Sequence, residues 1–350
     1  MADIEMATLF KRLNQIGFSK NFIQQKVLPD WWSADCESTP GAVIEAAAYI
    51  SRRLNLDLSS LLDIDTELRF RNSCQPKFKK QQNTNTEDLK VSHCLASRIA
   101  ELTAYACKTK YQPIDNYSVA KIRNMLLSSR QHIDLESVLQ FCWNHGIPVV
   151  HFNEFPKGVK KFHGMLAFFD KRPVIIVSLK DKSLTRLLFV VLHELGHIYR
   201  KHLNNTFLID EKIEFEDSDE EEAEANELAV EVMFGQLDRR NLLFPQLPSG
   251  EDIAQFALNI SKNQPNVDPG SIVMNDAWHR ANLAEATKND KKNIWAQARK
   301  ALKIIEGEVN ALVKINSFLK ENLDWEKLNE DNQEYLASMT GLKIEDVVGG

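Results

Sequence analysis

Five consecutive residues, His193-Glu194-Leu195-Gly196-His197, have a spacing that can bind a metal ion. Residues four apart on an α-helix lie on one face, one turn apart, so both imidazoles can reach the same ion. Glu194 can then face a water molecule beside that ion and act as a general base. The pattern predicts a zinc hydrolase site with His193 and His197 as ligands and Glu194 as the catalytic residue.

The residues before this motif indicate that its helix is buried. Leu187 to Leu192 is an unbroken apolar run, within a predicted helix from about Leu184 to Arg200. Burying two histidines and a glutamate is unfavourable unless a metal ion or hydrogen bonds compensate for the lost hydration. We therefore interpret the motif as a metal site rather than as core histidines beside an accidental glutamate.

A catalytic zinc ion needs a third protein ligand, and an acidic helix downstream offers several. This helix is predicted from about Asp219 to Phe234 and begins with Glu220, Glu221, Glu222 and Glu224. Ser218 and Glu221 resemble a capping box, and helix N-termini favour negative charge, which accounts for most of these acids.

Small residues in this second helix narrow the choice of ligand. Alanines at 223, 225 and 229 allow close packing on another helix and leave Glu222 and Asn226 one turn apart on a shared face. We predict that Glu222 binds the metal, with Glu224 or Glu221 as the alternatives. Asn226 would hydrogen-bond a liganding histidine or the carboxylate and fix its orientation.

Other polar residues near the motif have no assigned role. A group that stabilises the oxyanion is expected, and His151, His163 and Tyr199 are near the motif in sequence. His202 lies five residues after His197 and falls off the ligand face of a continuing helix. The cysteines are odd in number and form no CxxC pair, which favours reduced thiols.

The surrounding segments predict a predominantly helical α+β fold. Short strands are predicted at Val149–Phe152, Met165–Phe169 and Val174–Leu179, and a turn from Asp170 to Pro173 joins the last two. These strands would form a short three-stranded sheet in a small zincin-like core, with Val174–Leu179 as a candidate edge strand for an extended substrate. Apolar residues on one face from Ile294 to Leu312 predict a long helix near the C-terminus.

Changes in composition along the chain suggest four regions. A helical module covers residues 1–66, and a polar linker follows at 67–90. Residues 91–245 would form the metal-binding domain with its leading helices, the core being 135–236. Residues 246–350 would form a C-terminal helical region.

Composition excludes several classes of protein. The chain has 350 residues, of which 43% are hydrophobic, and a net charge of -6, which argues against a general nucleic-acid coat protein. Its longest strongly apolar run is too short to span a membrane, and acidic residues stand where a signal peptide would be basic. We expect a cytoplasmic protein without membrane association.

The order of these segments resembles the ImmA/IrrE family of zinc metallopeptidases. The resemblance covers roughly residues 135–236 and includes Glu222-Ala-Glu-Ala-Asn226-Glu-Leu-Ala229, although Leu228 stands where the family has Phe. It implies a gluzincin-type peptidase in which His193, His197 and Glu222 bind Zn²⁺ and Glu194 is the general base. Residues 27–54 also resemble the leading segment of longer bacterial and phage members.

The resemblance further implies a partner and a regulatory role. Family targets are repressors of phage, mobile-element or stress genes, so the expected function is endoproteolysis of a DNA-binding repressor or antitoxin, a role in transcription regulation and stress response. In some relatives N-terminal helices bind DNA, but here we favour a packing module. The alternative is a transcriptional or stress regulator that acts through DNA or protein binding by its helical flanks, with a structural or vestigial metal site.

Overall fold

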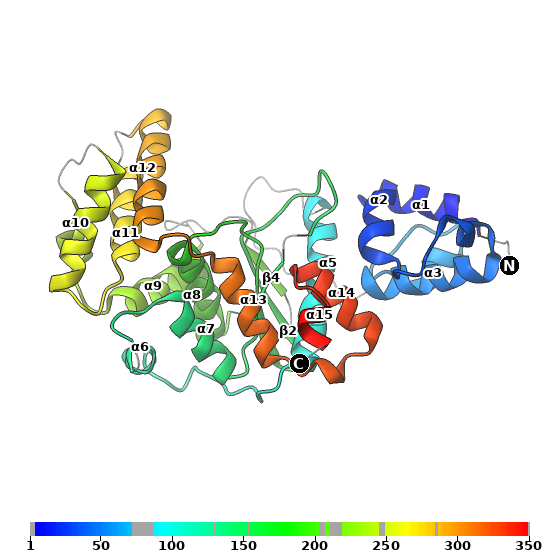
Figure 1. The fold of residues 1–350 in the computed structure, drawn as a ribbon, viewed down its shortest axis with the longest axis horizontal. Coiled ribbons are helices and arrows are strands. Elements are labelled where there is room, and N and C mark those ends of the chain that lie inside the picture. The colour runs from blue at the N-terminus through cyan, green and yellow to red at the C-terminus, as the bar shows by residue number, and fades with distance from the viewer. Residues whose placement is uncertain are drawn as a thin grey trace.

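A four-stranded mixed sheet lies at the centre of the molecule (Figure 1). The computed structural model describes residues 4–71, 87–128, 130–152, 154–202, 207–210, 219–244, 249–283 and 286–348. The strands are β1 (Val149–His151), β2 (Gly164–Phe169), β3 (Arg172–Val177) and β4 (Phe207–Asp210), in the order β1-β3-β2-β4. β3 runs parallel to β1 and antiparallel to β2, and β4 runs antiparallel to β2.

The predicted fold class is confirmed, and the sheet contains one strand more than the sequence indicated. The three predicted strands are present, and β4 adds a fourth. The expectation that Val174–Leu179 forms an edge strand is wrong, because β3 pairs on both sides. The edges of the described sheet are β1 and β4.

A tight turn sets the register of β2 and β3. Phe169 pairs with Arg172, so the loop consists of Asp170 and Lys171 alone, with φ angles of 48° and 66°. Positive φ at both loop residues is typical of the turns that follow the right-handed twist of a hairpin. The predicted turn is therefore present, but Arg172 and Pro173 already belong to β3.

Two long helices cover the sheet on opposite faces. α5 (Glu87–Ala106) and α8 (Leu184–Arg200) each contact both β2 and β3, and β2 is buried from Gly164 to Ala167 on both faces. α9 (Glu220–Phe234) packs along α8, and α6 (Val119–Leu127) and α7 (Leu135–Asn144) complete this layer. Helix α8 has the predicted range, and Ser183 caps its first turn.

The helices after residue 249 divide into two groups (Figure 1). α10 (Gly250–Asn263), α11 (Pro269–Ala281) and α12 (Lys288–Glu306) pack on one another. α13 (Ala311–Asn322) returns to β1 and α7, and α14 (Glu330–Thr340) packs on α5. The single long helix predicted from Ile294 to Leu312 is wrong, because α12 ends at Glu306 and is followed by Gly307, whose φ of 70° favours glycine.

Glu306, the last residue of α12, forms hydrogen bonds with the beginning of α8. The Glu306 carboxylate accepts hydrogen bonds from Ser183 Oγ at 2.9 Å and from the backbone N–H groups of Leu184 and Thr185, both at 3.0 Å. First-turn N–H groups have no partner within their own helix and carry partial positive charge. The carboxylate satisfies them and fixes the start of the helix that carries the metal-binding motif.

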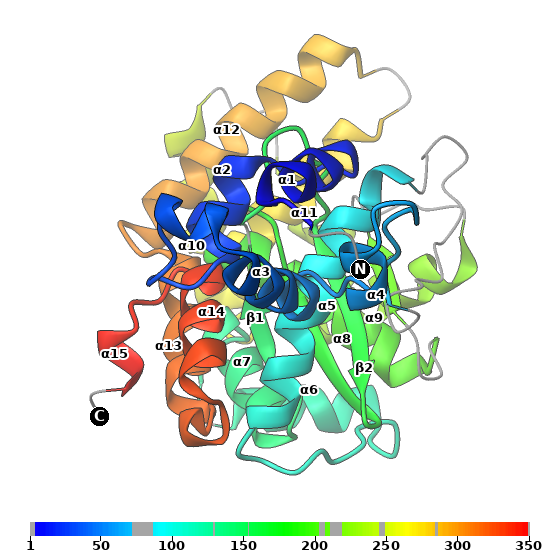
Figure 2. The same ribbon diagram turned by 90° about the vertical axis from the view of Figure 1, so that its right-hand side faces the viewer.

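Hydrogen bonds join the N-terminal helices to the C-terminal ones. α1 (Met6–Gln15), α2 (Lys20–Phe22), α3 (Pro40–Arg53) and α4 (Leu58–Leu62) form this module (Figure 2). The buried Tyr335 of α14 donates a hydrogen bond to the Arg53 carbonyl at 2.7 Å, and Arg53 donates to the Asp331 carbonyl at 3.0 Å. α15 (Glu345–Val348) ends the described chain.

Segments far apart in sequence also meet at the ends of α5 and α13. The residues after α5 and α13 form an antiparallel bridge between Cys107 and Leu323. Asp324 N donates to the Ala106 carbonyl at 2.8 Å.

The predicted boundaries at 66, 90 and 245 stay predictions, and residues 72–86 of the predicted linker lie outside the described residues. None of the described helices combines the length and the apolar character needed to cross a membrane.

Candidate metal centre

A very close helix–helix contact brings the two predicted ligand helices together. A Cβ atom added to Gly196 of α8 would lie 2.8 Å from both Cα and the carbonyl oxygen of Ala225 in α9. Only a hydrogen atom fits there, because real Cβ atoms do not approach backbone atoms so closely. The predicted role of small residues in close packing is therefore seen, on α8 as well as on α9.

Three side chains converge beside this contact. His193 Nε2 and His197 Nε2 are 3.0 Å apart, and the Glu222 carboxylate oxygens lie 3.2 Å from His193 Nε2 and 3.5 Å from His197 Nε2. Both histidines are fully buried, and Glu222 is 7% exposed. Over the described residues, this is the one group of three or more ligand-type side chains close enough to hold a metal ion together.

The spacing of these atoms fits a metal ion. Ligand atoms of a tetrahedral zinc site, with bonds of about 2.0–2.1 Å, lie roughly 3.3 Å from one another. The three distances in the cluster, 3.0, 3.2 and 3.5 Å, bracket that value. Of the two alternative ligands, Glu224 contacts His202 instead, and Glu221 is not part of the cluster.

Asn226 fixes the orientation of one histidine. Its Oδ1 lies 2.9 Å from His193 Nδ1 and is an acceptor, so Nδ1 carries the proton and donates. The Nε2 atom of His193 then presents a lone pair to the cluster. A contact with one of the histidines is one of the two that the sequence predicted for Asn226.

Glu194 lies against a strand residue that the sequence analysis did not single out. The side chain is fully buried, and a Cβ atom on Gly164 would overlap Glu194 Oε1. Gly164 begins β2, so the absence of a side chain there makes room for the carboxylate. A glycine directly before a predicted strand was the signal that could have identified this position.

The three oxyanion candidates differ in their surroundings. Tyr199 Oη donates to the Tyr117 carbonyl at 3.0 Å, which directs the hydroxyl to the loop before α6. His163 lies directly before β2, and its carbonyl accepts from Ser178 N at 3.0 Å. His151 pairs with Val177, which pairs with Gly164, so its side chain lies on the sheet face that Glu194 packs against.

Burial of His151 predicts a measurable pH dependence of stability. Desolvation lowers the pKa of His151 to about 4 from its ordinary value of 6.5. A hydrogen bond with the backbone of Leu179 acts in the opposite direction and raises the pKa, but its effect is smaller. Below pH 6.5 the unfolded chain binds a proton at this residue and the folded chain does not, so stability falls from pH 6.5 down to about 4. We expect a loss of about 2 kcal/mol from this residue between about pH 7 and 5.

Urea unfolding of the metal-free protein at several pH values checks this expectation. The unfolding free energy of His151→Gln should decline less steeply with falling pH than that of the unchanged protein. Equal slopes for the two proteins would show that His151 titrates normally in the folded state.

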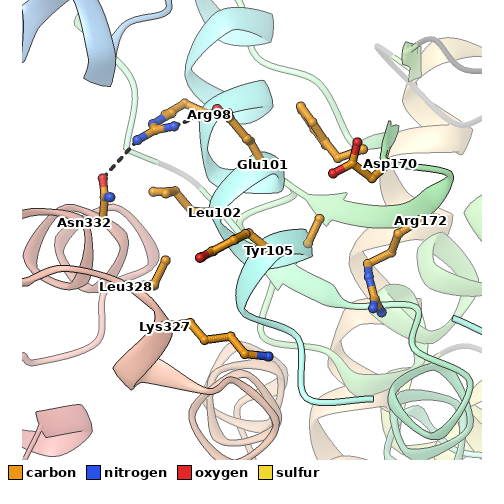
Figure 3. A pocket seen from close by; sticks show the side chains of 11 residues that line it. Arg98, Glu101, Leu102, Tyr105, Asp170, Arg172, Lys327, Leu328 and Asn332 are labelled. Atoms are coloured by element: carbon orange, nitrogen blue, oxygen red, sulfur yellow. Dashed lines mark hydrogen bonds and ion pairs between the residues drawn. The ribbon is translucent and has the colours of Figure 1, made fainter. Parts of the chain in front are cut away.

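The described cavity lies elsewhere. A cavity of about 580 Å³ opens between α5, the β2–β3 turn and α14 (Figure 3). Arg98 donates across its rim to Glu101 at 2.7 Å and to Asn332 at 2.9 Å. The lining includes Phe169 and Arg172, which share the sheet face covered by α5, so this cavity is separated from the metal cluster by the sheet.

An HExxH helix packed beside a helix that supplies a glutamate is the arrangement of the gluzincin class of metallopeptidases. Residues 142–262 match the model of a peptidase family described as the IrrE N-terminal-like domain. The match includes α8 and α9 with all three cluster residues, and it confirms the resemblance to ImmA/IrrE peptidases over this stretch. No curated protein matches the chain.

Proposed function

We propose that the chain is a zinc-dependent endopeptidase that cleaves a regulatory protein, such as a DNA-binding repressor or an antitoxin. The observation that carries the proposal is the buried convergence of His193 Nε2, His197 Nε2 and the Glu222 carboxylate. The peptidase family match supports peptide-bond hydrolysis. The class of substrate rests on the resemblance to ImmA/IrrE peptidases alone.

The residues of the cluster suit zinc rather than a harder cation. Two imidazole nitrogens and one carboxylate are the ligand set of many catalytic zinc sites, whereas Mg²⁺ and Ca²⁺ prefer oxygen ligands. When bound, zinc lowers the pKa of a coordinated water to about 7 and polarises the carbonyl of the scissile peptide bond. His193, His197 and Glu222 would hold the ion from two helices.

Glu194 would move the proton in this reaction. It follows a candidate ligand directly in sequence, and its carboxylate lies against Gly164. As general base it would take a proton from the attacking water, and as general acid it would deliver that proton to the leaving amine. The reaction needs no covalent bond between enzyme and substrate.

Metal removal tests the proposal. We expect the purified protein to contain about one zinc ion per chain by elemental analysis and to cleave a fluorogenic peptide library. Dialysis against a chelator should abolish cleavage, and stoichiometric zinc should restore it. Glu222→Gln should lose most of the zinc, because a neutral amide is a much poorer ligand than a carboxylate.

The substrate is best sought among neighbouring gene products. Incubating the zinc-loaded protein with a repressor-like protein encoded beside it, and weighing the fragments by mass spectrometry, would identify the scissile bond. A chain that binds no zinc, or that cleaves equally well after chelation, would contradict the proposal.

A further inference from the structure

His202 lies next to the candidate ligand His197 because α8 ends just before His202. Lys201 adopts a left-handed conformation with a φ of 57°, and His202 N donates to the His197 carbonyl at 3.1 Å. This turn folds His202 back over the last turn of α8. Its side chain is 5% exposed, although a continuing helix would have directed it away from the cluster.

Two hydrogen bonds connect His202 to its neighbours on both sides. His202 Nδ1 lies 2.8 Å from His197 Nδ1, and His202 Nε2 lies 2.8 Å from Glu224 Oε2. Glu224 is one of the acidic residues near the start of α9, two residues after Glu222. A chain of contacts therefore runs from the surface carboxylate of Glu224 through His202 to His197.

The Glu224 carboxylate sets the direction of these hydrogen bonds. The Glu224 carboxylate accepts, so His202 Nε2 carries a proton and donates to it. In neutral His202, Nδ1 then has a lone pair and accepts from His197 Nδ1–H. His197 is left with a lone pair on Nε2, the atom that faces His193 and Glu222.

Each candidate histidine ligand thus has its own hydrogen-bond partner at Nδ1. The neutral amide of Asn226 hydrogen-bonds His193. His202 hydrogen-bonds His197 and is itself hydrogen-bonded to the Glu224 carboxylate. A carboxylate at the far end of such a chain makes the ligand nitrogen more basic and restricts the rotation of its ring. Both effects strengthen binding of a cation at Nε2.

We propose that His202 and Glu224 are positioning residues of the metal site, acting together through His197 to fix its tautomer and ring orientation. The inference rests on the proposed metal site. It gives a role to Glu224, which helix capping would otherwise explain, and to His202, which is not a candidate ligand.

Zinc affinity, measured by competition with a chromophoric chelator, tests this role. Removing such a support typically weakens metal binding 10–100-fold, so we expect losses of about that size in His202→Phe and about tenfold in Glu224→Ala. His202→Gln keeps an acceptor in reach of His197 and should retain more affinity than His202→Phe. The double variant His202→Phe/Glu224→Ala should bind zinc no more weakly than His202→Phe, because both changes break one chain.

Controls separate this role from folding and from general charge. Glu220→Ala removes the same charge from the first turn of α9, at an exposed position, and should leave zinc affinity unchanged. Unfolding temperatures of the metal-free variants should match within a few degrees, and His202→Gln and Glu224→Ala keep the test usable if His202→Phe does not fold. Unchanged affinity in folded variants overturns the inference alone, whereas absence of zinc binding by the unchanged protein overturns the metal site itself.

Discussion

Replacing Glu194 by glutamine is expected to lower kcat/KM for peptide cleavage by about 10²–10⁴ while zinc content and stability stay close to those of the unchanged protein. The amide has nearly the shape of the carboxylate but cannot take a proton from water. Glu194 is not in the cluster of candidate ligands, so the metal would remain bound. Steady-state cleavage of the best library peptide, with elemental analysis of the same sample, provides the measurement.

A matched substitution distinguishes loss of the base from loss of the metal. Glu222→Gln should also be inactive, but with little zinc, whereas Glu194→Gln should be inactive with a full complement. A Glu194→Gln protein as active as the unchanged one would exclude Glu194 as the general base.

Gly196→Val is expected to destabilise the protein by about 3 kcal/mol and to weaken zinc binding at least tenfold. The new side chain must displace the backbone of Ala225, which lies 2.8 Å from the position of its Cβ atom. Separating α8 from α9 moves Glu222 away from the histidines. The gain in helix propensity over glycine is below about 1 kcal/mol and does not offset this cost.

Gly41 offers a control for this substitution. It is also a helical glycine, in α3, and a Cβ atom there would have no neighbour within 4 Å. Gly41→Val should change the unfolding free energy by less than about 1 kcal/mol and leave zinc affinity unaltered. Similar stabilities of the two variants in urea unfolding would show that α8 and α9 adapt to a larger side chain.

Local patterns were sufficient to predict the elements that carry the site. The range of α8 follows from its apolar run, and the cluster follows from residues one turn apart on two helices. Such features depend on residues close in sequence. Even Asn226 could be assigned a contact, because a shared helix face limits what it can reach.

Features that depend on tertiary structure were not predicted. β4 comes from a short segment whose pairing with β2 has no local signal, and its presence changes which strands are edges. His202 was set aside because helical periodicity was continued through Lys201, whose left-handed turn reverses the chain. Glu306 likewise reaches the start of α8 from more than a hundred residues away.

The bridge between Cys107 and Leu323 joins the segments that follow α5 and α13, which lie on either side of the stretch that matches the family. The stretch that matches the family, 142–262, contains the cluster but neither α5, which covers one face of the sheet, nor α13, which packs on β1. Excised alone, it would expose apolar strand residues to water. The matched stretch therefore depends for its stability on α5 and α13, and an insertion that displaces either helix can destabilise the sheet without changing a residue of the cluster.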